Sequence, residues 1–327
     1  MNALLEQWYD IGQVRTVRAI PGGYGGSVYW VQSDQGQYIL KDSCQNGMNH
    51  PENEASILEK LRLSGIPVSQ ICLTRKGESV VREEGHVYHL QTFIRGKVWK
   101  PNTAPEWLLY ELGHLLGRIQ HCMKDLDPLP TGMGQGFFDY VTPERAIRHH
   151  QDTLKQAEAY GHTDIISALQ YKIRSLEAFP AITFQLSQLT CCNTHGDFKL
   201  GQVIGGENKI NGIIDFTSAC VHPMCWEVIR SYLSADPECV QGQLHTGHFQ
   251  RYVSRFLEYG SLHSLDIKMM PWLYYFQILT SDYFGQYYRT NNPGRQELLG
   301  DAFLAVKQCM WFEQHITQLE DVLRDGF

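Results

Sequence analysis

Short stretches of alternating apolar and polar residues dominate the first third of the chain. Five of them are rich in β-branched and aromatic residues and are separated by turns: residues 14–20, 27–31, 38–41, 68–74 and 86–94. This pattern predicts short strands joined by hairpin turns. Between the third and the fourth stretch, Ile57, Leu58 and Leu61 recur at helical spacing. They predict one helix over residues 51–64, which ends at Gly65.

Longer patterns with a helical period follow Gly96. Apolar residues recur every three or four positions in three segments: 106–123, 143–160 and 165–178. Two short strands interrupt this helical region: 190–194 and 210–216. The chain from about 226 to 326 is again helical and rich in aromatic residues. We therefore expect an α+β protein with two domains, a β-rich one over residues 1–95 and a helical one over residues 96–327.

Composition narrows the classes of function. The 327-residue chain carries a net charge of −7 and has no basic run, which argues against a general nucleic-acid binder. No apolar run approaches the ~18 residues that a membrane span needs. The N-terminus becomes acidic at Glu6, too early for a secretory signal. We expect a cytoplasmic protein that binds neither nucleic acid nor a membrane.

The clearest chemical signal lies between residues 195 and 216. Asp197 follows a predicted strand and stands between a glycine and an apolar residue, where a carboxylate has few structural explanations. Asp215 lies eighteen residues further on, after two isoleucines, and a buried carboxylate generally needs a cation or hydrogen-bond donors. Lys199 and Gln202 lie between the two acids. Phosphoryl transfer requires such a set, with one carboxylate to accept a proton and another to hold Mg²⁺.

A glycine-rich loop precedes this motif by some 170 residues. Gly23 and Gly25 lie between two predicted strands, which excludes a Rossmann arrangement, and the chain contains no P-loop string. Glycines allow backbone amides to approach phosphates, and Ser27 adds a hydroxyl donor. Taken alone, the run is equally compatible with a plain turn.

Lys41 ends an apolar strand after this loop, and Glu54 lies early on the next predicted helix. An unpaired ammonium group is costly to bury, so Glu54 is the natural partner of Lys41. Each residue taken singly could also be solvated on the surface. The order of glycine loop, lysine and glutamate-bearing helix favours the ion pair.

Together these motifs resemble the aminoglycoside phosphotransferase and choline kinase-like family of small-molecule kinases. The resemblance implies a bilobal protein-kinase-like fold that binds ATP in the cleft between its lobes. It implies nucleotide contacts from the glycine loop, the lysine–glutamate pair and a hinge at residues 91–96, in which adenine bonds the Thr92 carbonyl and the Ile94 amide. The nucleotide-binding residues would be Gly23, Gly25, Ser27, Lys41, Glu54, Gln91, Thr92 and Ile94.

The resemblance also assigns the chemistry. Asp197 would be the catalytic base, Lys199 would neutralise the γ-phosphate, and Asp215 with Gln202 would hold Mg²⁺. The family normally carries asparagine at the place of Gln202. Glutamine keeps the amide oxygen but moves it by ~1.5 Å unless its rotamer compensates. Mg²⁺ demands near-ideal octahedral geometry, so this departure matters.

The resemblance predicts transfer of the γ-phosphate of ATP to a hydroxyl group of a small molecule. Amino alcohols, aminoglycosides, homoserine and sugars are the candidate acceptors. Because of Gln202, the alternative is a pseudokinase-like protein that binds nucleotide with impaired catalysis. A cluster of aromatic residues over 272–288 is either an aromatic cage for a cationic acceptor or part of the core.

Overall fold

The computed structural model describes residues 1–20, 27–44, 51–290 and 294–327. These form two compact units. The first unit contains Met1–Lys100, Arg118–Pro130 and Asn193–Cys220, and the second contains Pro101–Gly117, Thr131–Cys192 and Val221–Phe327. The two units are therefore not separated by one cut in the sequence, and the predicted domain division after residue 95 stays a prediction.

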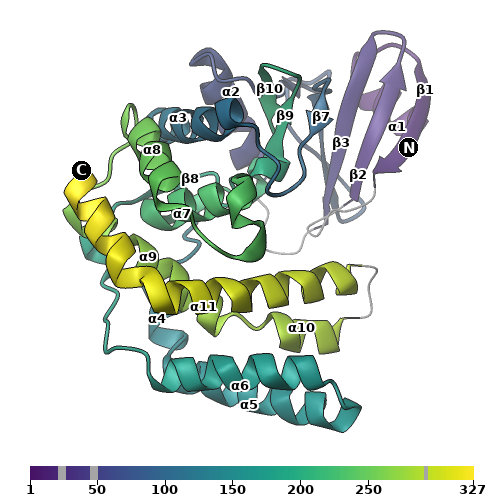
Figure 1. Ribbon diagram of the computed structural model, residues 1–327. Helices are drawn as coiled ribbons and strands as arrows, with labels where there is room; N and C mark the ends of the chain where they lie inside the picture. The colour runs from purple at the N-terminus through teal and green to yellow at the C-terminus, as the bar shows by residue number, and fades with distance from the viewer. Residues whose placement is uncertain (21–26, 45–50, 291–293) are drawn as a thin grey trace. The chain divides into compact units, whose positions relative to one another are not determined.

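The first unit is built on two antiparallel sheets (Figure 1). The larger has the order β1-β2-β3-β6-β4, with β5 also paired to β6, and the smaller has the order β10-β9-β7. Its elements are α1 (Asn2–Trp8), β1 (Val14–Ile20), β2 (Ser27–Ser33), β3 (Gly36–Cys44), α2 (Pro51–Leu63), β4 (Ile71–Cys72), β5 (Val81–Glu83), β6 (His86–Thr92), β7 (Lys97–Val98), η2 (Leu200–Gln202), β9 (Val203–Gly205), β10 (Ile210–Ile213) and η3 (Phe216–Ser218).

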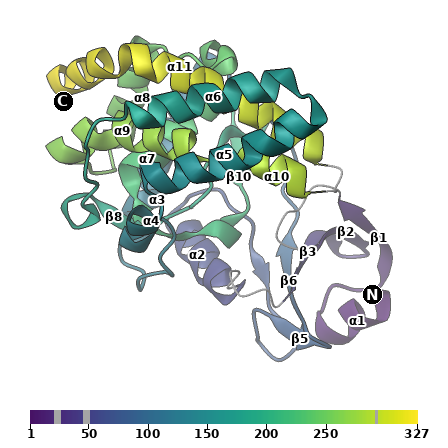
Figure 2. The same cartoon turned by 90° about the horizontal axis from the view of Figure 1, so that it is seen from below.

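The two faces of the larger sheet have different roles. Leu40 of β3 and Leu90 of β6 are paired across the ladder and belong to a core that also contains Leu5 of α1; Figure 2 shows α1 beside the sheet. Because successive side chains of a strand point to opposite faces, the neighbouring pair of Lys41 and His89 points the other way. That second face carries the polar residues of the candidate site.

The second unit is helical. Its elements are α4 (Gln135–Tyr140), α5 (Pro143–Tyr160), α6 (Thr163–Glu177), η1 (Leu186–Gln188), α7 (Met224–Ala235), η4 (Pro237–Gln241), α8 (Thr246–Leu257), α9 (Ser264–Thr280), α10 (Tyr283–Arg289) and α11 (Arg295–Gly326). The helices α5 and α6 lie side by side, and α11 runs along α9 and α10 (Figures 1 and 2). Three further elements, α3 (Glu106–Met123), β8 (Cys191–Thr194) and β11 (Cys220–Pro223), have residues in both units.

Local signals explain where the helices begin and end. The Thr142 side chain accepts a hydrogen bond from the Arg145 amide at the start of α5, and Pro143 occupies its first turn. Gly161 ends that helix in the left-handed conformation, with φ of 69°. The α+β class predicted from the sequence is confirmed. No helix in the described ranges is both long and apolar enough to cross a bilayer.

The aromatic cluster predicted over 272–288 lies mainly in the core of the second unit. Tyr275, Phe276 and Tyr287 are buried. The rings of Tyr275 and Phe312 stack with centroids 6.2 Å apart, and Phe276 packs against Phe184 at 5.1 Å. For these residues the structure favours the core-packing alternative over the aromatic cage.

Candidate active site

Lys41 lies between two carboxylates in the first unit. Its Nζ atom is 2.7 Å from Glu54 Oε1 and 3.4 Å from Asp215 Oδ1. Burial lowers the pKa of Lys41, but the charges of Glu54 and Asp215 outweigh burial and the pKa lies above its ordinary value. Lys41 is therefore held as a cation next to a carboxylate 174 positions away in the sequence. The prediction that its strand ends at Lys41 is wrong, because β3 stays paired with β6 as far as Cys44.

Glu54 is almost fully buried, with 1% of its side chain exposed. Its second oxygen, Oε2, lies 3.0 Å from His89 Nε2. Burial raises the pKa of the Glu54 carboxyl group, but the Lys41 charge and the His89 hydrogen bond overcome burial and hold the pKa well below its usual range. Glu54 is thus an anion that two basic side chains surround.

The backbone around Asp197 requires a glycine. Gly196 has a φ of 79°, and a β-carbon there would overlap the Ser218 carbonyl oxygen. His195 is buried beneath this turn; its Nε2 lies 3.0 Å from the Ile214 carbonyl oxygen, and its Nδ1 accepts a 3.3 Å hydrogen bond from the Asp197 amide. Burial lowers the pKa of His195, which favours the neutral ring that these two contacts demand. His195 joins the Asp197 loop to the strand that leads to Asp215.

Gln202 lies between the two aspartates. Its Nε2 atom donates to Asp197 Oδ2 at 3.0 Å and lies 3.5 Å from Asp215 Oδ2. Lys199 Nζ lies 2.9 Å from the same Asp197 oxygen. Two donors thus offset the mutual repulsion of the carboxylates, and the four residues of the sequence motif form one cluster.

Asp215 has an unusual backbone conformation, with φ of 69° and ψ of 57°. Non-glycine residues rarely adopt this left-handed region, and aspartate tolerates it better than most. The Thr217 hydroxyl donates to Asp215 Oδ1 at 2.7 Å. The strand predicted over 210–216 therefore ends at Ile213, since the turn at Asp215 is incompatible with a sheet ladder.

A cavity of 320 Å³ opens beside these charged groups. Apolar side chains of β1, β2, β3 and β9 form much of its wall, and Lys41, Gln202 and Asp215 give it a polar end. Its lining residues are Ile20, Val28, Ile39, Lys41, Ser69, Gln91, Thr92, Phe93, Ile94, Val98, Gln202, Ile204, Ile214 and Asp215. Small-molecule sites typically combine such apolar walls with a few convergent polar groups.

The segment predicted as a hinge lines this cavity. The Thr92 amide donates to the Gln70 carbonyl at 2.9 Å, and the Phe93 amide donates to the Gln37 carbonyl at 3.1 Å. Gly212 makes room for Ile94, since a β-carbon at Gly212 would collide with the Ile94 side chain. Three predicted hinge residues, Gln91, Thr92 and Ile94, are thus all at the cavity.

The glycine loop is the part of the predicted site that the structure does not place. Gly23 and Gly25 lie outside the described residues. Ser27 is the first residue of β2, is exposed and pairs with Asp42 of β3. Sequence reasoning assigned no role to His89, His195 or Thr217, although His195 stands in the motif itself and Thr217 is two residues beyond Asp215.

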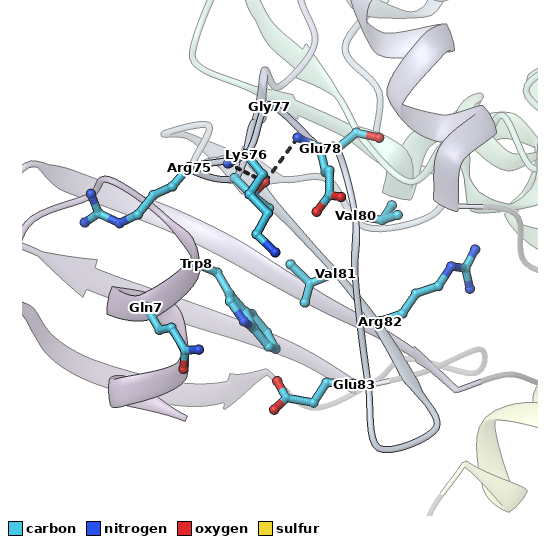
Figure 3. Close-up of a pocket in the computed structure, with 12 residues that line it drawn as sticks. Gln7, Trp8, Arg75, Lys76, Gly77, Glu78, Val80, Val81, Arg82 and Glu83 are labelled. Carbon is cyan, nitrogen blue, oxygen red and sulfur yellow. Dashed lines mark hydrogen bonds between the residues drawn. The ribbon is translucent and has the colours of Figure 1, made fainter.

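A larger cavity of 1010 Å³ lies elsewhere in the first unit (Figure 3). Trp8 of α1 and Val81 of β5 line it, together with charged side chains of the 75–83 segment such as Lys76 and Glu83. No predicted site residue lines this cavity, and its charges are of both signs. It lacks a group of polar side chains directed at one point, such as Lys41, Gln202 and Asp215 in the smaller cavity.

The geometry agrees with comparison to known proteins. The sequence profile described as "Phosphotransferase enzyme family" (APH) matches residues 16–258, well over half of the chain. The chain belongs to this phosphotransferase family. The matched segment includes Lys41, Glu54, Asp197 and Asp215, so the family membership predicted from the sequence is confirmed.

One curated relative of this phosphotransferase family member is a homoserine kinase. Homoserine kinase of Pseudomonas aeruginosa strain LESB58 is 24% identical over 221 residues, which cover 67% of this chain and 65% of that kinase. The chain thus spans 65% of the length of that curated relative.

Two solved structures share the fold. Amicoumacin kinase hAmiN, in complex with AMP-PNP, Ca²⁺ and amicoumacin, is 14% identical with a TM-score of 0.64, over 93% of this chain and 91% of its own. The microcompartment-associated aminopropanol kinase is also 14% identical, with a TM-score of 0.61 over 98% and 97% of the two chains. The protein-kinase-like fold predicted from the sequence is therefore confirmed.

Proposed function

We propose that this protein transfers the γ-phosphoryl group of ATP to a hydroxyl group of a small molecule. The observation that carries the proposal is the position of Lys41, Gln202 and Asp215 at the polar end of an otherwise apolar cavity. Adenine fits the apolar part, where the Ile94 amide is the hinge donor that remains after those of Thr92 and Phe93 are engaged. Lys41 then binds the α- and β-phosphates, while Glu54 keeps it extended.

The residues present are suited to Mg²⁺. Asp215 offers carboxylate oxygens with 43% of its side chain exposed, and Gln202 offers an amide oxygen. In the described residues, no group of three or more His, Cys, Asp or Glu side chains could hold a metal ion. That is compatible with Mg²⁺, which commonly uses one or two carboxylates together with water and substrate phosphates. When bound, the ion would neutralise charge that develops on the phosphoryl oxygens.

A side chain of the protein would accept the proton that the acceptor hydroxyl loses. Asp197 accepts a hydrogen bond from the acceptor hydroxyl and takes its proton as the new P–O bond forms, while the bond from the γ-phosphorus to the bridging oxygen breaks and ADP leaves. Lys199, 2.9 Å from Asp197, offsets the negative charge of that carboxylate beforehand and approaches the γ-phosphate during transfer. In the structure Gln202 presents its amide nitrogen to both aspartates, so coordination through Oε1 requires the amide to rotate.

Small amino alcohols are the acceptors that we propose first. Support comes from the homoserine kinase relative and from the neighbouring aminopropanol kinase, since homoserine and aminopropanol each carry an amine and a primary or secondary hydroxyl. Aminoglycosides come second, because several neighbours of the same fold are aminoglycoside phosphotransferases. A cytoplasmic location stays a prediction.

The second candidate is a pseudokinase-like nucleotide binder. Gln202 favours it, because its side chain is one methylene longer than the asparagine that the family normally carries, and Mg²⁺ demands near-ideal geometry. The two candidates share nucleotide binding and differ only in turnover.

An ADP-release assay tests the proposal. The parent protein and Asp197→Asn would be incubated with MgATP and, in turn, homoserine, other amino alcohols, aminoglycosides and sugars. We expect one acceptor class to stimulate ADP release from the parent protein and none to stimulate it from the variant. Thermal stabilisation by MgATP without release for any acceptor would favour the pseudokinase. No stabilisation at millimolar MgATP would refute both candidates, because a ligand at 100 times its Kd adds ~2.7 kcal/mol.

A further inference from the structure

His89 and Lys41 lie on neighbouring strands and both contact the carboxylate of Glu54. The two residues are directly opposite each other in the β3–β6 ladder. Lys41 Nζ lies 2.7 Å from Glu54 Oε1, and His89 Nε2 lies 3.0 Å from Glu54 Oε2. Each oxygen of Glu54 therefore lies within 3.0 Å of a basic nitrogen on the sheet, Oε1 beside Lys41 and Oε2 beside His89. Lys41 alone would leave Glu54 free to rotate about its terminal bond.

The environment of Glu54 makes this second contact necessary. Glu54 has 1% of its side chain exposed and His89 has none, so water does not compete for the carboxylate. A carboxylate oxygen only accepts hydrogen bonds, so His89 carries its proton on Nε2. Within the described chain, His89 Nδ1 is buried and has no hydrogen-bond partner. The polar contacts of the His89 ring are therefore made through Nε2.

A polar chain joins His89 to the nucleotide cavity. The Gln91 side-chain amide lies 3.0 Å from His89 Nε2 and 2.7 Å from the Ser69 hydroxyl. Because His89 Nε2 carries its proton, the amide turns its oxygen toward His89 and its nitrogen toward Ser69. Because a hydroxyl both donates and accepts, Ser69 bonds the Gln91 amide in either orientation of that amide. Gln91, Ser69 and Lys41 all line the 320 Å³ cavity. This series of polar contacts begins at the cavity wall with Ser69 and Gln91 and continues through His89 and Glu54. It ends at Lys41, at the polar end of the cavity.

We propose that His89 is a positioning residue for nucleotide binding, which orients Glu54 and thereby sets the place of the Lys41 ammonium group. The inference rests on the proposed function, since it concerns how that site binds the phosphates of ATP. A hydrogen bond to a buried charged group is strong enough that its loss should weaken MgATP binding about tenfold or more. The KM of the hydroxyl acceptor should change little, because His89 contacts Glu54 and Gln91, which are assigned to the nucleotide and not to the acceptor.

Three substitutions at His89 separate positioning from packing. His89→Leu removes the donor and keeps an apolar side chain in the buried site. His89→Gln places an amide N–H near the position of Nε2, whereas His89→Asn places it near that of Nδ1. We expect weak MgATP binding for the leucine and asparagine variants and recovery for glutamine. Leu90→Val is the matched control, because Leu90 is buried in the same strand but faces the opposite core; it should lower the melting temperature without changing the Kd of MgATP.

A double-mutant cycle with Glu54→Gln tests whether His89 acts through Glu54. In that background His89→Leu should cause no further loss of MgATP affinity, measured by calorimetry. Equal losses in both backgrounds, or an unchanged Kd in His89→Leu with only a lower melting temperature, would overturn the inference while leaving the proposed function intact. Failure of the parent protein itself to bind MgATP would instead overturn the proposed function and the role of His89 with it.

Discussion

Gln202 donates its side-chain amide to Asp197 across 3.0 Å. The residue that departs from the usual asparagine of this family is therefore in direct contact with the proposed base. This contact determines what substitutions at Gln202 should do.

Gln202→Asn should leave turnover similar or raise it. The shorter side chain brings the amide oxygen back to the distance that the family normally uses for the metal. Gln202→Leu removes the amide at similar volume and should lower turnover by about two orders of magnitude or more, since metal stabilisation of the phosphoryl group is worth several kcal/mol. ADP release at saturating acceptor, measured over a range of Mg²⁺ concentrations, checks both. A silent parent protein that gains turnover in Gln202→Asn would identify a pseudokinase.

Substitutions of Asp197 and Asp215 should have different effects, the first on turnover and the second on nucleotide binding. Asp197→Asn keeps the shape of the side chain and removes the base, so turnover should be lost while the Kd of MgATP changes little. Asp215→Ala removes a carboxylate beside Lys41 and should weaken nucleotide binding in the presence of Mg²⁺ but much less in its absence. Calorimetry with and without EDTA makes the comparison. Normal turnover in both variants would place the chemistry elsewhere.

Gly196→Ala should destabilise the first unit. The left-handed φ of 79° and the collision with the Ser218 carbonyl oxygen together cost about 1–3 kcal/mol. Gly201→Ala is the matched control, because nothing lies within 4 Å of a β-carbon there and its φ is not left-handed. Urea unfolding of the two variants gives the difference. Equal midpoints would show that the Asp197 turn relaxes without penalty.

Glu54 should make the protein sensitive to acid. Its pKa is held below the ordinary value of 4.5 in the folded state. As pH falls below about 4.5, the unfolded chain takes up a proton at Glu54 and the folded protein does not, so the free energy of unfolding decreases. Glu54→Gln should be less stable at neutral pH, by about 3 kcal/mol because Lys41 loses its buried partner, but its stability should vary less between pH 6 and 3. Chemical denaturation across that range measures how the free energy of unfolding changes with pH. If Glu54 were not the group involved, this change would be the same in the parent protein and in Glu54→Gln.

Lys172 should change stability with pH in the same direction as Glu54, but in the alkaline range. It is buried in α6, donates to the Ser281 carbonyl oxygen at 2.7 Å, and burial lowers its pKa to about 8 from 10.5. Between these two values the unfolded chain binds more protons than the folded one, so stability due to this residue rises with pH. Relative to Lys172→Met, the parent protein should gain stability from pH 8 to 10.5. A constant difference would mean that the folded Lys172 titrates normally.

The sequence alone determined the local elements and the local motif. Residues Asp197, Lys199 and Gln202 are within six positions of one another, so any turn after the strand brings them together. The alternation of residues 38–41 predicted a strand that ends in lysine, and the spacing of Ile57, Leu58 and Leu61 predicted the helix that carries Glu54. These signals are short-range, and the structure confirms both elements, although the strand continues beyond Lys41 to Cys44.

Only the tertiary structure decided which side chains meet across the chain. Nothing among the sequence neighbours of His89 marks it as a site residue. Strand register places it opposite Lys41 and against Glu54. The left-handed turn at Asp215 points that carboxylate at Lys41, 174 positions earlier. Register and turn conformation depend on contacts between distant segments, which a pattern of neighbouring residues does not encode.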